Sequence, residues 1–127
     1  MEAEDRWQGY PHQREPLIAA LAAAGGAMVV TGDMHFGAVQ ELGGPTEVGE
    51  GIPEVAAGPG GSTIFPMGAI TSLAVDDPVQ YLELVDTWST CWFELDPGLG
   101  TLTVAFIDDA GETLATRTLD LPESSEA

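Results

Sequence analysis

Asp33 and His35 are the residues of this chain whose types and spacing best suit chemistry. They stand in the segment TGDMH (31–35), directly after the short apolar run 27–30. In an extended chain, residues two apart point to the same side, with Cα atoms about 7 Å apart. A carboxylate and an imidazole placed in this way can bind one metal ion, or one each of two ions about 3.5–4 Å apart. The spacing therefore predicts metal ligation by Asp33 and His35.

The same segment also has a structural interpretation, as a plain turn from a strand into a loop. In that case Asp33 accepts hydrogen bonds from backbone amides and His35 only packs. Gly32 fits either interpretation, because the lack of a Cβ lets the backbone come close to a bound group or to another segment. The tetrapeptide Gly-Asp-Met-His alone does not decide between the two, so its surroundings matter.

The surrounding pattern predicts an α/β domain. A helix is expected at 15–24, with Pro16 in its first turn, and Gly25-Gly26 end it. A strand is expected at 27–31, because the apolar run 27–30 is typical of a strand buried on both faces of a sheet. Residues 36–42 are expected to form a short helix or turn, and 52–57 an edge-like strand that leads into the loop Gly-Pro-Gly-Gly-Ser (58–62).

The second half of the chain changes to an alternating pattern. After a stretch expected to be loop with a short helix (65–78), strands are predicted at 82–85, 87–95, 102–106 and 113–121, which together make an antiparallel meander. Ser89, Cys91, Phe93 and Leu95 share one face of the second of these strands. The single cysteine, Cys91, is therefore expected to be a buried structural thiol.

The charge balance restricts the partners. Three arginines, no lysine and 21 acidic residues give a net charge of −18 over 127 residues. We therefore expect no nucleic-acid-binding surface, because binding phosphate backbones needs clustered cations. An anionic small substrate needs a local cation, which a bound metal supplies. The longest apolar stretch, 17–28, is too short and interrupted for a membrane span, and no signal-peptide pattern opens the chain.

A family resemblance follows from two further features. The pattern Trp7-x-Gly9-Tyr10-Pro11-x-x-Arg14, a helix and a strand ending in Gly-Asp-x-His together resemble the C-terminal half of alkaline phosphatase D-like (PhoD-like) enzymes, members of the calcineurin-like metallophosphoesterase superfamily. The segment Glu-Val-Ala-Ala-Gly-Pro (54–59) and the closing meander are similar as well. The resemblance therefore covers nearly the whole chain.

The resemblance implies a fold, an activity and cofactors. The fold would be the C-terminal half of a four-layer α/β/β/α sandwich. A dinuclear centre of Ca, Fe, Mn or Zn ions would clamp a phosphate mono- or diester and generate hydroxide for in-line attack on phosphorus. Asp33 and His35 would be the last ligand motif, with Asp in place of the first His of Gly-His-x-His, and Gly32 would lie beside them.

Three residues receive possible roles in the cleft. Trp7 and Tyr10 would form walls of the cleft, or equally would anchor a loop as buried aromatics. Arg14 would clamp phosphate, although a salt bridge on the helix surface is the commoner role of such a residue. His12, in a polar loop, is expected to be exposed and idle.

The sequence also departs from the family pattern. It contains no Asn, no Gly-Asp-x-x-Asp and only two histidines, whereas a dinuclear centre needs about six to eight protein ligands. We therefore expect 1–127 to be a single partial domain with an acidic tail at 122–127, inactive alone, that associates with the missing N-terminal half or with itself. The alternative is a non-catalytic β-rich accessory or binding module with a structural Gly-Asp-x-His turn.

The charge generates a first prediction. We expect the melting temperature to rise as sodium chloride increases from low to molar concentration, because salt screens the repulsion among the 21 acidic side chains. A thermal scan at each salt concentration, beside a neutral domain of similar size, measures this. A flat response would contradict destabilisation of the fold by repulsion among the acidic side chains.

Overall fold

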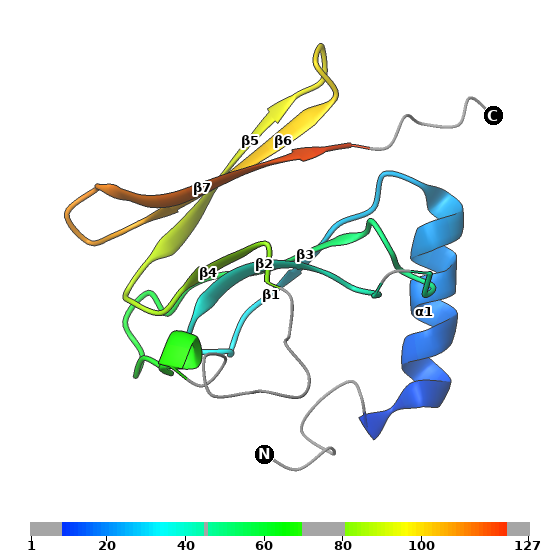
Figure 1. The fold of residues 1–127 in the computed structure, drawn as a ribbon, viewed down its shortest axis with the longest axis horizontal. Helices are drawn as coiled ribbons and strands as arrows, with labels where there is room; N and C mark the ends of the chain where they lie inside the picture. Colours follow the sequence, from blue (N-terminus) through cyan, green and yellow to red (C-terminus); the bar gives the residue numbers. More distant parts are fainter. Residues whose placement is uncertain (1–8, 45, 70–80, 122–127) are drawn as a thin grey trace.

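The computed structural model of the chain describes residues 9–44, 46–69 and 81–121. These residues form the helix α1, seven strands and a short helical segment at 67–69 (Figure 1). The helix is α1 (Pro11–Ala24), and the strands are β1 (Val29–Thr31), β2 (Gly37–Glu41), β3 (Pro53–Ala56), β4 (Glu83–Val85), β5 (Thr90–Asp96), β6 (Thr101–Ile107) and β7 (Thr113–Asp120). Trp7 and the tail 122–127 lie outside the described residues.

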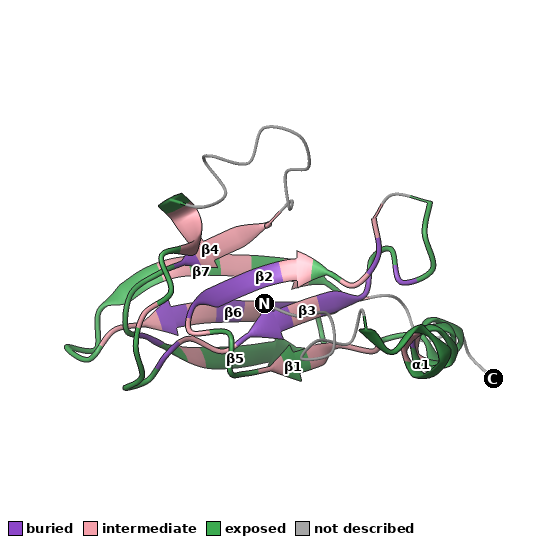
Figure 2. Ribbon diagram, turned by 90° about the horizontal axis from the view of Figure 1, so that it is seen from below, coloured by how far each residue is buried: buried purple, intermediate pink, exposed green. Residues whose placement is uncertain are grey.

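The strands form two sheets that stack face to face. The first sheet has the order β1-β3-β2-β4, in which β1 runs parallel to β3 and the other neighbours are antiparallel. The second sheet, β5-β6-β7, is fully antiparallel. Helix α1 stands beside one end of the first sheet and does not cover a sheet face (Figures 1 and 2). The fold is therefore mixed α/β, built on two sheets.

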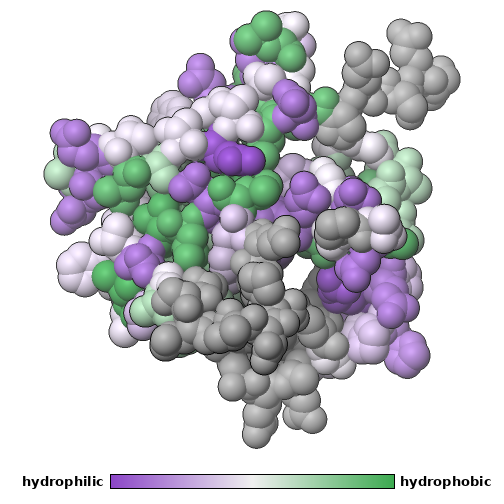
Figure 3. Space-filling model, in the orientation of Figure 1, coloured by the Kyte–Doolittle hydropathy of each residue, from purple (hydrophilic) through white to green (hydrophobic). Residues whose placement is uncertain are grey.

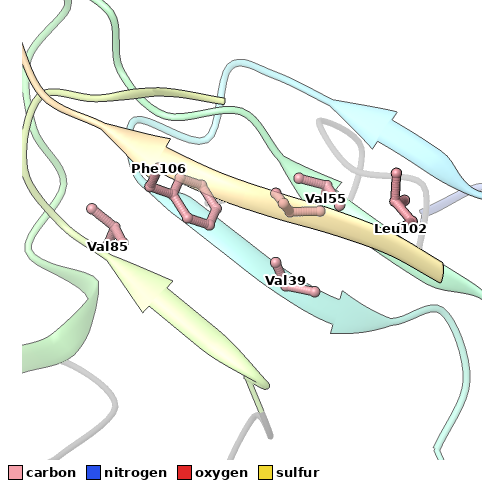
Figure 4. Packing of buried hydrophobic residues seen from close by; sticks show 6 residues of the cluster. Val39, Val55, Val85, Leu102 and Phe106 are labelled. Carbon is pink, nitrogen blue, oxygen red and sulfur yellow. The ribbon is translucent and has the colours of Figure 1, made fainter. Parts of the chain in front are cut away.

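The main core lies between the two sheets. Val39 and Val55 from the first sheet and Val104 and Phe106 from β6 are fully buried there (Figure 4). The phenyl ring of Phe106 rests directly on the backbone of β2, because a Cβ built on Gly37 would lie 2.5 Å from its Cε1 atom. Buried apolar area is the main source of folding free energy, so this contact holds the two sheets together.

A smaller cluster lies on the opposite face of the first sheet. Phe36, Ala38 and Ala56 are buried there, and Ala38 and Ala56 directly neighbour the core valines of their strands, so they point the other way. Tyr81 packs its ring edge-to-face on Phe36, with ring centroids 5.9 Å apart. Residues from the segments after β3 and before β4 therefore cover part of this face.

The antiparallel meander is confirmed for β5, β6 and β7. The strand expected at 82–85 was wrongly assigned to it, because β4 pairs with β2 in the first sheet. Strand β6 alternates half-buried and buried side chains, as the period-two pattern predicts. At its two ends, Asp96 and Asp108 stabilise the turns, because each accepts hydrogen bonds from two backbone amides through its Oδ1 atom. Aspartate is favoured in turns for this reason. Of the stretch 65–78, residues 65–66 are loop, 67–69 are helical, and 70–78 lie outside the described residues.

The predicted start of the helix was wrong. α1 begins at Pro11, and Pro16 lies inside it. Pro11 is tolerated at the first helical position, where an amide has no partner within the helix, and the carbonyl of Tyr10 accepts bonds from Gln13 and Arg14. The predicted end is confirmed, since Gly25 follows Ala24 with a φ of 67°. None of the described helices is long and apolar enough to cross a membrane.

Three strand predictions were also wrong. The strand expected to be buried on both faces is β1, an edge strand in which Val30 is 52% exposed. The strand expected at an edge is β3, which lies centrally between β1 and β2; its Pro53 is the first residue, where the missing amide is tolerated. Residues 37–41, expected as helix or turn, form β2. Local hydrophobicity does not fix strand order, which depends on long-range pairing.

The fold generates a stability prediction with a matched control. Val39→Ala should lower the free energy of unfolding by about 2–3 kcal/mol, because it deletes two methyl groups from the fully buried core. The same substitution at the exposed Val30 should change it by less than about 0.5 kcal/mol. Urea unfolding of both variants measures the difference. Equal effects at the two positions would contradict the stacking of the two sheets over Val39.

Candidate functional site

Asp33 and His35 lie together in a hollow at the carboxyl ends of two parallel strands. The chain leaves β1 through Asp33 and His35 and leaves β3 through the loop 57–62, and the Ala57 amide donates to the Thr31 carbonyl at 2.9 Å. The hollow has a volume of about 340 Å³ and is lined by Gly32, Asp33, His35, Ala57, Gly58, Pro59, Gly60, Gly61 and Ser62. Ligand sites of open α/β sheets commonly lie at this position.

The backbone at the two candidate ligands is not extended. Asp33 has a φ of 64° and His35 a φ of 60°, so both adopt the left-handed conformation. The extended geometry expected for this segment was therefore wrong. Left-handed residues other than glycine cost about 1–3 kcal/mol each and persist where surrounding contacts hold them. One such contact is the bond from the Phe65 amide to the His35 carbonyl, at 2.8 Å.

The side chain of Asp33 distinguishes the two interpretations of the turn. In a structural turn its carboxylate accepts bonds from backbone amides, as Asp96 and Asp108 do elsewhere in the chain. Among the described residues, the Asp33 carboxylate accepts no hydrogen bond, and the side chain is exposed. Its oxygens are therefore free to bind a ligand, and the turn is held by other contacts.

The glycine-rich loop is held in place by the segment just before β5. Gly58 lies so close to the buried Ser89 that a Cβ at this position would overlap the Ser89 hydroxyl. The indole Nε1 of Trp88 donates to the carbonyl of Ser62 at 2.9 Å. These two contacts fix both ends of the loop 58–62 and thereby shape one wall of the hollow.

Trp88, Ser89 and the loop itself were missed as site residues. The sequence identified 58–62 as a loop but gave no reason to place it beside Asp33. A usable signal was the order of the elements, since a loop after a strand parallel to β1 must lie at the same edge of the sheet. The sequence carries no comparable signal for Trp88 and Ser89, whose contacts span about 30 residues of chain.

The other predicted residues lie elsewhere. Tyr10 precedes the first residue of α1 and is 47% exposed. Arg14 donates from Nη2 to the Leu42 carbonyl at 3.2 Å and lines a second hollow, of about 620 Å³, between α1 and Val48. His12 is exposed, as expected, but it lies in α1 rather than in a loop, and it also lines the second hollow. Of the possible cleft residues, the structure therefore places Gly32 with Asp33 and His35, and Tyr10 and Arg14 apart from them.

The donor types at the site fit a metal ion, but their number is small. A carboxylate oxygen and an imidazole nitrogen suit Mn, Fe and Zn, and oxygen alone suits Ca. Within the described part of the chain, no three His, Cys, Asp or Glu side chains come together as a metal-binding group. The two arginines of the described residues, Arg14 and Arg117, do not line the hollow, so neither replaces a metal ion as its cation. Metal ligation by Asp33 and His35 stays a prediction.

Cys91 is a structural thiol, as expected, although it is half-buried rather than buried. Burial raises the pKa of the Cys91 thiol above its usual range, and a backbone hydrogen bond from Gly58 partly opposes this. A raised pKa keeps the thiol protonated and unreactive near neutral pH. Cys91 therefore supports the loop at Gly58 and is not a candidate nucleophile.

Comparisons with known proteins identify no relative. The chain matches no protein-family model, no curated protein and no solved structure. The relation to alkaline phosphatase D-like enzymes therefore rests on the sequence pattern and remains a resemblance.

The loop contact generates a prediction with an internal control. Gly58→Ala should lower the free energy of unfolding by about 1–3 kcal/mol, because the new methyl group overlaps Ser89. Gly60→Ala in the same loop should have little effect, because nothing lies within 4 Å of a Cβ there. Thermal or urea unfolding of both variants measures this. A Gly58→Ala protein as stable as Gly60→Ala would show that the loop is not held against Ser89.

Proposed function

We propose that this chain supplies Asp33 and His35 to a metal centre that hydrolyses phosphate mono- or diesters, as the C-terminal half of an alkaline phosphatase D-like enzyme with a four-layer α/β/β/α sandwich. The observation that carries the proposal is the pairing of a free carboxylate and an imidazole in one hollow, at the carboxyl ends of parallel strands. The two stacked sheets are compatible with the inner layers of such a sandwich.

The residues of the hollow have separate roles in this proposal. Asp33 would bind a metal through a carboxylate oxygen and His35 through a ring nitrogen. Metal ions in such sites lower the pKa of bound water and neutralise charge on a phosphoryl group. A net charge of −18 otherwise repels a phosphate ester, so the charge of the metal matters for substrate binding as well. Gly32, Gly60 and Gly61 line the hollow without adding side chains to it.

The remaining ligands would come from the missing N-terminal half. Two protein ligands leave most coordination positions of a divalent ion to water, so we expect weak binding by this chain alone. The open edge of β1, with its exposed Val30, offers a pairing surface for additional strands. The isolated chain should therefore be catalytically silent, and an added N-terminal half should supply both metal affinity and turnover.

The second candidate function is a non-catalytic accessory or binding module. The observation that favours it is the lack of a third metal-ligating side chain near Asp33 and His35 among the described residues. In this case the left-handed turn at 33–35 only connects β1 with β2. The two candidate functions differ in whether the side chains of Asp33 and His35 bind a metal ion.

Metal titration tests the proposal without requiring turnover. Mn²⁺ added to the chain should bind weakly, as measured by the electron paramagnetic resonance signal of free Mn²⁺, and Asp33→Ala and His35→Ala should each weaken binding by about tenfold or more. The matched controls are Asp109→Ala, in an exposed turn, and His12→Ala, in the second hollow. Both should bind Mn²⁺ like the unaltered chain.

The same four variants test catalysis when the chain is extended at its N-terminus by the missing half. Hydrolysis of p-nitrophenyl and bis-p-nitrophenyl phosphate should be lost in the Asp33→Ala and His35→Ala variants and kept in the two control variants. Equal Mn²⁺ binding by all four variants, or full activity of either site variant, would contradict the proposal and favour the accessory module.

A further inference from the structure

Strand β5 (Thr90–Asp96) is an unprotected sheet edge. It pairs with β6 on one side, and no strand of the described residues pairs with its other side. Natural edge strands are usually protected by a short length, a bulge, a proline or a lysine. β5 has no proline, lysine or bulge, it is seven residues long, and its register to β6 is regular. Its only charged residues, Glu94 and Asp96, lie toward its C-terminal end. By contrast, the edge strand β1 has only three residues.

The inward face of β5 carries apolar side chains that the sandwich leaves exposed. Phe93 lies opposite Val104 and Leu95 opposite Leu102, so both share the face that forms the core. Their β6 neighbours are at most 6% exposed, but Phe93 is 37% and Leu95 60% exposed. Beyond them, the turn between β5 and β6 adds Leu99, which is 77% exposed. Figure 3 shows hydrophobic surface at this tip of the hairpin.

We propose that β5 pairs antiparallel with β5 of a second copy of this chain, in the register that places Phe93 opposite the partner's Phe93. The three-stranded sheets of the two copies then form one six-stranded sheet. On the inward face, Leu95 lies opposite the partner's Cys91 and adds to the Phe93 contact. On the outward face, Trp92 lies opposite the partner's Glu94, and Thr90 opposite the partner's Asp96.

The sequence of β5 favours this register over its neighbours. Directly opposed side chains lie on the same face of a sheet. A symmetric pair of β5 strands must therefore be centred on one residue that faces its own copy. Centring the pair on Glu94 would oppose two carboxylates, which destabilises a sheet. Centring it on Trp92 would leave Leu95 and Asp96 without partners inside the strand. The Phe93 register pairs all seven residues and opposes no two charges.

Net charge determines the conditions under which the pair forms. Two chains of −18 each carry −36 together, which opposes association at low ionic strength. Salt shortens the range of this repulsion from about 10 Å at 0.1 M to about 3 Å at 1 M. Burial of apolar side chains does not depend on that screening, so the dimer should strengthen with salt. If β5 instead bound a positively charged segment of another protein, salt would screen the attraction and weaken binding. The direction of the salt dependence therefore distinguishes self-association from binding of a cationic partner.

Sedimentation equilibrium of the full chain tests the proposal. We expect a monomer–dimer equilibrium with a dissociation constant that falls by about tenfold or more between 0.1 and 2 M sodium chloride. Phe93→Lys should remain a monomer throughout, because it opposes two ammonium groups at the symmetry axis. The matched control is Leu114→Lys on β7, the other edge of the sheet, where the side chain is 41% exposed. It should dimerise like the unaltered chain.

A cross-linking variant decides the matter if circular dichroism shows that Phe93→Lys does not fold. Phe93→Cys in a Cys91→Ala background should form a disulfide-linked dimer when diamide oxidises the two thiols, whereas Leu114→Cys in that background should not. A monomer at every salt and protein concentration, a Phe93→Lys dimer, or equal cross-linking of the two cysteine variants would each overturn the proposal.

Discussion

The parallel pairing of β1 with β3 is the contact on which the candidate site depends. It places the carboxyl ends of the two strands side by side, so the turn at 33–35 and the loop 58–62 enclose one hollow. Because parallel strands require a long connection, the pairing brings together segments about 25 residues apart. β2 is part of that connection and also pairs antiparallel with β3, so β3 is held from both sides.

The position of β3 depends in turn on the packing between the sheets. Val55 of β3 and Val39 of β2 pack on the side chains of β6, and Gly37 allows Phe106 to approach the backbone of β2. Changes in the core therefore reach the site through β3, whose end carries the loop. The contact of Gly58 with Ser89 is a second connection between the loop and the β5 end of the sandwich.

The exposed apolar residues of the sandwich lie largely at its edges. Val30 on β1 and Phe93 and Leu95 on β5 are exposed, and both strands lie along the same side of the molecule (Figure 2). Exposed apolar edge residues are a liability for a monomer and are normally covered by a partner. The acidic surface opposes uncontrolled association through repulsion, so the two features together favour association that is specific and salt-dependent.

The sequence by itself determined the local elements that depend on local chemistry. The alternation in β5, β6 and β7 predicted the meander, because one face of each strand must be apolar and the turns need Asp and Gly. Gly25 and Gly26 correctly marked the end of α1, since both adopt a positive φ. The pairing of an Asp and a His after an apolar strand identified the two residues that lie together in the hollow.

Only the tertiary structure decided the strand order, the backbone at the site and the second wall of the hollow. A short apolar strand such as 27–31 can have the same composition at the edge of a sheet as in its centre. The positions predicted for β1 and β3 in the sheet were therefore wrong. The left-handed conformation of Asp33 and His35 is unfavourable locally and is imposed by the surrounding chain. Likewise, Gly58 lies beside Asp33 only because β3 pairs with β1, a long-range contact that no local pattern encodes.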